Sequence, residues 1–159
     1  MRMTRRIMFL AAAFTLIAVS SAPAQVQHEI ALTRADIQTE RQALVAENLP
    51  LTEDQAKAFW PMYRTYREEL AKLGDRFVAL IEDYAKNYET MTDPQASTMI
   101  KEFLKIQKEE VAIKTAWVPK FEKILPAKAV ARFFQIENKL DIIVRAEVAA
   151  EIPLVAHEK

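Results

Sequence analysis

Cysteine is absent from this sequence, and glycine occurs only once, at Gly74. Without cysteine the protein has no disulfides, no thiolate metal ligands and no thiol redox chemistry. A single glycine cannot form a Gly-rich phosphate loop or a hydrolase nucleophile elbow. Ser97 and Thr98 have no histidine within reach on any expected helix face. The sequence therefore predicts a protein that is not an enzyme, takes no cofactor and is held together by apolar packing.

Basic runs, and basic residues interleaved with aromatics, are also missing. Such patterns are typical of surfaces that bind nucleic acid. The chain carries 22 Lys and Arg against 22 Asp and Glu, so neither sign of charge dominates. No nucleic-acid partner is expected, and no small-molecule substrate is evident.

Long apolar runs are absent except near the N-terminus. Three arginines within residues 1–6 precede an apolar run at residues 7–19, and residues 22–24 read Ala-Pro-Ala, a pattern that signal peptidase cleaves. The run is shorter than the about 20 residues of a transmembrane helix. The pattern predicts a signal peptide at residues 1–24, cleaved before Gln25, and export to the periplasm. The alternative is an uncleaved segment that anchors the protein in the inner membrane.

Abundant Ala, Glu, Lys, Leu and Arg are typical of long helices. Proline and capping signals delimit four predicted helices. They cover residues 33–48, residues 53–88, a segment from Asp93 as cap to the prolines at 119 and 126, and residues 127–151. The predicted fold is all-α, an elongated four-helix hairpin or bundle. It forms one domain at residues 25–153, followed by a flexible tail at residues 154–159.

The second predicted helix carries an apolar stripe whose steps alternate between four and three residues. Its members are Phe59, Tyr63, Tyr66, Leu70, Leu73, Phe77, Leu80 and Tyr84. This spacing is the seam of helices that pack at a shallow angle. Pro61 predicts a kink in the helix. Gly74 has two explanations, a close helix crossing or simple tolerance at a cost of up to about 1 kcal/mol.

Leu51, Thr52 and Gln55 combine a helix-capping signal with a short motif. The hydroxyl of Thr52 can accept a hydrogen bond from the backbone N–H three residues on, and the Gln55 side chain can reach back to the N–H of Thr52. This predicted capping box starts the helix at Glu53. The same residues complete the pattern LTxxQ.

With this motif, its predicted export and its four-helix plan, the chain resembles the Spy/CpxP family of bacterial periplasmic stress proteins. That family carries two LTxxQ motifs, of which the second is reduced here to Leu125, with Pro126 in place of threonine. Phe59-Trp60-Pro61 and Tyr63 bring the resemblance closer to a separate proteobacterial branch than to the well-known members. The resemblance implies bent helical hairpins paired into a cradle-shaped homodimer. It also implies roles as ATP-independent chaperones or as partners of envelope stress sensors.

Charged residues interrupt the apolar stripes of three predicted helices. They are Arg41 in the first helix, Glu110 in the third and Glu137 in the fourth. A charge in an apolar seam is costly unless it is paired. We expect Arg41 to pair with Glu137 or Glu110 in a network that fixes the helix register.

A metal site or an acid–base pair inside the bundle is the alternative reading of these carboxylates. Di-iron bundles combine glutamates with Glu-x-x-His motifs, which this chain lacks. Its two histidines, His28 and His157, lie near the two ends of the mature chain. No metal ligand is therefore assigned.

The aromatic residues are expected mostly in the core, and Phe133 falls on the stripe of its helix that is predicted to be buried. Four apolar residues are also the candidates for an intermolecular surface: Trp60, Phe133, Phe134 and Ile142. The helix at residues 127–151 has apolar side chains over about half of its circumference, with Ile142 opposite the main stripe. An apolar face outside the core can bind a second copy or an unfolded client. Both remain open, the homodimer being the simpler.

These patterns together predict an exported periplasmic binding protein, chaperone-like or related to envelope stress and independent of ATP. One alternative is a periplasmic protein that responds to zinc or copper. Another is a structural envelope protein without a client.

Overall fold

The computed structural model describes residues 38–155 of the chain. The chain divides into two compact units, Met1–Glu40 and Arg41–Lys159. Helical residues up to Asn48 open the second unit, and three long helices follow: α2 (Glu53–Asn87), α3 (Asp93–Glu122) and α4 (Ala127–Glu151). The described residues contain no strand, so the all-α prediction is confirmed. The predicted signal peptide, His28 and His157 lie outside the described residues.

The helix bounds follow the capping and proline signals closely. The capping box at Thr52 is present, with Gln55 Oε1 3.0 Å from the Thr52 nitrogen and Thr52 Oγ1 3.3 Å from the Gln55 nitrogen. The prediction for the start of the third helix was wrong by one residue, because its cap is Thr92 and not Asp93. Pro119 lies inside α3 and does not end this helix. Pro126 is the N-cap residue of α4 and lies in the connection between α3 and α4.

A second Thr-x-x-Gln sequence, not among the predicted motifs, begins α3. Gln95 Oε1 accepts from the backbone N–H of Thr92 at 2.9 Å, as Gln55 does for Thr52. Thr92 and Gln95 therefore repeat the spacing of the first capping box, whereas Pro126 provides no side-chain cap for α4. The signal was readable in the sequence as Met91-Thr92 followed by Gln95.

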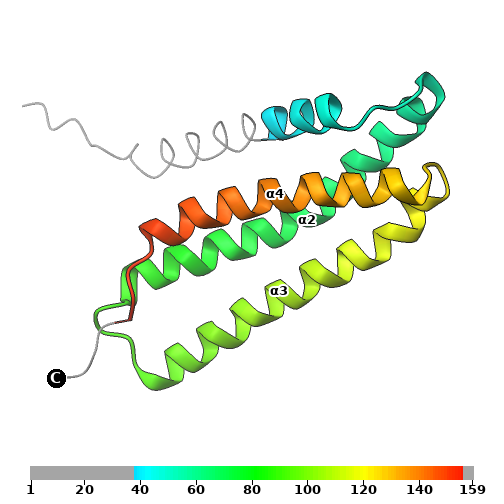
Figure 1. The fold of residues 1–159 in the computed structure, drawn as a ribbon. Helices are drawn as coiled ribbons and strands as arrows, with labels where there is room; N and C mark the ends of the chain where they lie inside the picture. The colour runs from blue at the N-terminus through cyan, green and yellow to red at the C-terminus, as the bar shows by residue number, and fades with distance from the viewer. Residues whose placement is uncertain (1–37, 156–159) are drawn as a thin grey trace, which may run out of the picture. The chain divides into compact units, whose positions relative to one another are not determined.

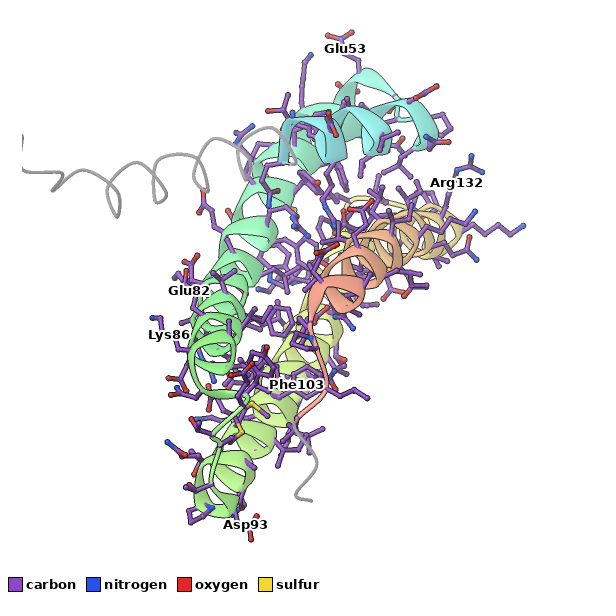
Figure 2. The ribbon with its side chains drawn as sticks, turned by 90° about the vertical axis from the view of Figure 1, so that its left-hand side faces the viewer. Glu53, Glu82, Lys86, Asp93, Phe103 and Arg132 are labelled. Atoms are coloured by element: carbon purple, nitrogen blue, oxygen red, sulfur yellow. The ribbon has the colours of Figure 1, made fainter. Side chains whose placement is uncertain are left out.

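The three long helices run in alternating directions and lie side by side (Figure 1). Glu53 and Asp93, the first residues of α2 and α3, are consequently at opposite ends (Figure 2). Short connections of a few residues favour this arrangement of neighbouring antiparallel helices.

Aromatic rings fill the core near the connection between α3 and α4. Phe59, Phe121 and Phe133 are completely buried. The ring centroids of Phe121 and Phe133 are 4.9 Å apart, and those of Phe59 and Phe133 are 5.2 Å apart. Each buried aromatic side chain contributes about 1.5–3 kcal/mol relative to exposure. Val45, Leu49, Tyr63, Tyr66, Leu70, Trp117, Leu125 and Val130 complete this cluster.

The other half of the α2–α3 pair has a thinner core. The rings of Phe77 and Phe103 pack at 6.1 Å between centroids, with Phe103 on the side of α3 that faces α2 (Figure 2). Arg76 of α2 donates to Glu102 of α3 at 2.6 Å, and also to Glu109. The polar bonds hold the helices together where apolar burial is smaller.

Gly74 in α2 does not mark a close helix crossing. A Cβ atom built at this position would meet no atom within 4 Å. The first of the two explanations is therefore wrong, and the position merely tolerates glycine.

Candidate functional site

Glu137 is a carboxylate in the interior of the bundle, and its side chain is 1% exposed. It lies one helical turn after Phe133 on the same face of α4, so the helix carries both side chains into the core. Its Oε2 atom accepts from Arg41 Nη1 at 3.2 Å and from Arg67 Nη1 at 2.9 Å. Because Arg41 precedes α2 and Arg67 lies within it, one carboxylate connects three helical segments.

Further ion pairs extend from Arg41 to α3. Arg41 Nη2 lies 2.9 Å from Asp141 Oδ1, and Lys114 Nζ of α3 lies 2.7 Å from Asp141 Oδ2. Lys114 also contacts Glu110 Oε1 at 2.6 Å. Glu110 was the other partner predicted for Arg41. It pairs instead with Lys114 and with Arg145.

We call these seven residues the charge network. Its members are Arg41, Arg67, Glu110, Lys114, Glu137, Asp141 and Arg145. Charges of opposite sign alternate along it, so each buried group faces a partner, as a charge in a low-dielectric interior requires.

The centre of the charge network stabilises its groups in their charged forms. Burial opposes the ionisation of Asp141, but the hydrogen bond from Lys114 and the positive charge of Arg41 prevail and hold the pKa of Asp141 below its usual value. Burial likewise opposes the charge of Lys114, but its bonds to Asp141 and Glu110 prevail and raise its pKa. Lys114 and Asp141 therefore form an ion pair over the whole physiological pH range.

Two phenols of α2 lie beside this network. Burial, reinforced by the negative charge of Glu137, raises the pKa of Tyr63 and of Tyr66 far above the usual range. Among the described residues their hydroxyls have no hydrogen-bond partner, and neither has Glu137 Oε1. Neither phenol can act as a base near neutral pH, and Glu137 is closed off from solvent. The arrangement supports the structural reading of the charge network over an acid–base pair.

The carboxylates of the charge network face cationic side chains. No three His, Cys, Asp or Glu side chains of the described residues lie in an arrangement that could hold a metal ion. Glu110, Glu137 and Asp141 each contact at least one cationic side chain instead.

The predicted intermolecular surface does not form as a unit. Phe133 is fully buried in the core of its own chain, so its assignment to a surface was wrong: the helical stripe turns it toward Phe59 and Phe121. Trp60 and Phe134 are half-buried and pack against this core. Only Ile142 is exposed, at 57%.

A different apolar surface lies between the segment of residues 41–48 and α4, and we call it the Leu44 groove. It is lined by Leu44, Asn48, Arg132, Gln135, Ile136, Lys139 and Leu140. Leu44 is 40% exposed, and Ile143, three residues beyond Leu140 on the same side of α4, is 55% exposed. Arg132 Nε donates to the carbonyl oxygen of Asn48 at 2.5 Å. The groove therefore has an apolar floor, and the basic residues Arg132 and Lys139 lie along its rim.

The Leu44 groove could not be predicted from the sequence, because a groove depends on how two segments are placed. The only sequence signal was the second apolar row of α4, formed by Ile136, Leu140 and Ile143, beside the row that enters the core.

In comparisons with known proteins, no family model, no curated protein and no solved structure matches the chain. Within residues 38–155, none of the helices combines the length and the apolar character needed to cross a membrane.

Proposed function

We propose that this protein is an exported helical binding protein that holds apolar segments of other polypeptides in the Leu44 groove, without ATP. The observation that carries the proposal is a groove with a partly exposed aliphatic floor, formed by Leu44, Ile136 and Leu140, and a positively charged rim. Most aliphatic side chains of this size are buried in a monomeric bundle, and a concave apolar surface is typical of ligand and peptide sites.

The charge network gives this groove its rigidity. One wall is the segment of residues 41–48, which Arg41 attaches to α4 through Glu137 and Asp141. Val45 of this wall and Leu49, which follows it, are buried in the aromatic core. A wall fixed by both packing and ion pairs needs little ordering when a client binds, which favours affinity.

Export to the periplasm belongs to the same proposal and is supported by the signal-peptide pattern. The resemblance to the Spy/CpxP family supports a role in handling unfolded envelope proteins.

The test is the suppression of aggregation of a chemically denatured model protein, measured by light scattering at near-stoichiometric ratio without nucleotide. We expect protection by the mature protein and its loss in the double variant Leu44→Glu/Leu140→Glu. Ile142→Glu is the matched control, because Ile142 is exposed on another side of α4 and should leave the protection intact. Circular dichroism verifies that each variant remains helical. Equal protection by the double variant and the wild type would exclude the groove as the client site.

A further inference from the structure

The outward side of α3 carries an apolar row with lysines beside it. Ile100 is 46% exposed, Leu104 54% and Val111 63%. At 100° per residue these three side chains fall within a narrow sector of the helix. Lys101, Lys105 and Lys108 are exposed and lie along one edge of this row. We call these six residues the α3 ridge.

Acidic side chains are turned away from the α3 ridge. Glu102 and Glu109 point to Arg76 of α2, and Glu110 points to Lys114 and Arg145. These are the acidic residues of α3 between its first turn and Glu122. The ridge is therefore positive over most of the helix, although the chain as a whole carries no net charge.

We propose that the α3 ridge is a docking surface for anionic phospholipid membranes, separate from the client-binding role of the Leu44 groove. Aliphatic side chains on one helix face enter the interface between head groups and acyl chains, and neighbouring lysines reach the lipid phosphates. The row from Ile100 to Val111 extends for about 16 Å at the helical rise of 1.5 Å per residue. Docking through three aliphatic side chains and three lysines is weak, reversible and sensitive to salt.

The composition of the ridge favours a membrane over a protein partner. Protein interfaces are enriched in aromatic residues and arginine at their centres and depleted in lysine. The α3 ridge has the opposite composition, and it is a convex row rather than a pocket. An antiparallel pairing with a second copy of this chain is also disfavoured, because it would place the lysine edges of the two ridges side by side.

The experiment is co-sedimentation of the mature protein with two kinds of vesicles. One kind consists of phosphatidylcholine alone, and the other of phosphatidylcholine and phosphatidylglycerol in equal parts. We expect binding to the second kind only, and a loss of binding at high salt. The double variant Lys101→Glu/Lys108→Glu should lower the partition coefficient by about thirtyfold or more, since each lysine near an anionic surface contributes a several-fold attraction.

The matched control is Lys72→Glu/Lys128→Glu, which makes the same change of net charge at exposed positions of α2 and α4 and should retain most of the binding. A tryptophan introduced as Leu104→Trp should shift its emission to the blue on adding anionic vesicles. The proposal is overturned if the vesicles do not bind the protein, or if both double variants lose binding equally. Binding of soluble polyglutamate in the absence of vesicle binding also overturns it, in favour of an acidic protein partner.

Discussion

Glu137 is the most deeply buried charged residue of the described part of the chain. Two guanidinium groups share its Oε2 atom, and Arg41 is 5% exposed. The variant Glu137→Gln keeps the shape of the side chain but removes the negative charge that both guanidinium groups contact. Removing one partner of a buried pair costs about 3–5 kcal/mol, and we expect the free energy of unfolding in urea to fall by that amount.

Glu147→Gln serves as the control for this variant, because Glu147 is an exposed residue of the same helix. Its effect should stay within about 0.5 kcal/mol. Should Glu137→Gln be as stable as the wild type, the charge network would have no structural role.

Asp141 gives the network a defined dependence on pH. Its pKa is lower in the folded protein than in the unfolded chain, despite the opposing effect of burial, because Lys114 and Arg41 favour its charged form. Its contribution to stability is therefore complete above the unfolded pKa of about 3.9 and is lost as the pH falls through the lower folded value. The stability difference between wild type and Asp141→Asn should be constant from about pH 5 to about pH 8 and should shrink in stronger acid. Urea denaturation at a series of pH values measures it, and a difference that grows in acid would contradict the assigned pKa direction.

Gly74 offers a substitution that should stabilise the protein. Space is open around its missing Cβ, and alanine restricts the unfolded chain more than glycine does. Gly74→Ala should raise the free energy of unfolding by about 0.4–1 kcal/mol. The reverse change at an exposed position of the same helix, Ala71→Gly, should lower it by a similar amount. A destabilised Gly74→Ala protein would mean that a neighbouring helix lies closer than the structure shows.

The burial and pairing of individual charged residues could be predicted only in part, because their side chains are long. Arg41 and Glu137 fall inside apolar stripes, so the sequence indicates that they are buried and paired. Asp141, Lys114 and Arg67 lie at the borders of such stripes. Whether a long side chain at a border turns inward depends on the neighbouring helices, and the sequence does not contain that arrangement.

The helices themselves begin at signals that act within a few residues. At the starts of α2 and α3, Gln55 and Gln95 accept from the backbone N–H groups of Thr52 and Thr92. Such local bonds, together with the prolines, explain why the starts of α2, α3 and α4 could be read from the sequence with an error of about one residue. The end of α3 was less well predicted, because the helix passes Pro119 and ends at Glu122. Which face of one helix packs against which face of the next can be predicted only once the antiparallel order of the helices is known.

The two capping boxes should contribute comparably to stability. Thr52→Ala and Thr92→Ala each remove an N-cap side chain and should cost about 1 kcal/mol. Thermal unfolding followed by circular dichroism measures the loss. Gln107→Ala, in the exposed middle of α3, is the control and should leave the melting temperature nearly unchanged. If either cap variant behaves like this control, that cap does not contribute to the stability of its helix.

For the molecule as a whole, composition and periodicity predicted the all-α class but not the surfaces. Phe133 was placed both on the buried stripe and among the surface candidates, because apolar side chains cover about half of α4, and the structure buries it completely. The Leu44 groove and the α3 ridge both consist of apolar residues that the core does not use. The placement of the neighbouring segments decides which apolar row stays outside the core. This placement belongs to the tertiary structure and cannot be read from one helix.

The central claim is that the segment of residues 41–48 is docked on α4 as part of one cooperative bundle, since this docking forms the Leu44 groove. Native-state hydrogen exchange tests it most directly through the amide of Leu49, which donates to the carbonyl oxygen of Val45 at 2.9 Å. We predict that this amide exchanges only through global unfolding, with the same free energy as the buried amides of α4. Rapid exchange of residues 41–49 while α4 stays protected would contradict the docking, and with it the groove.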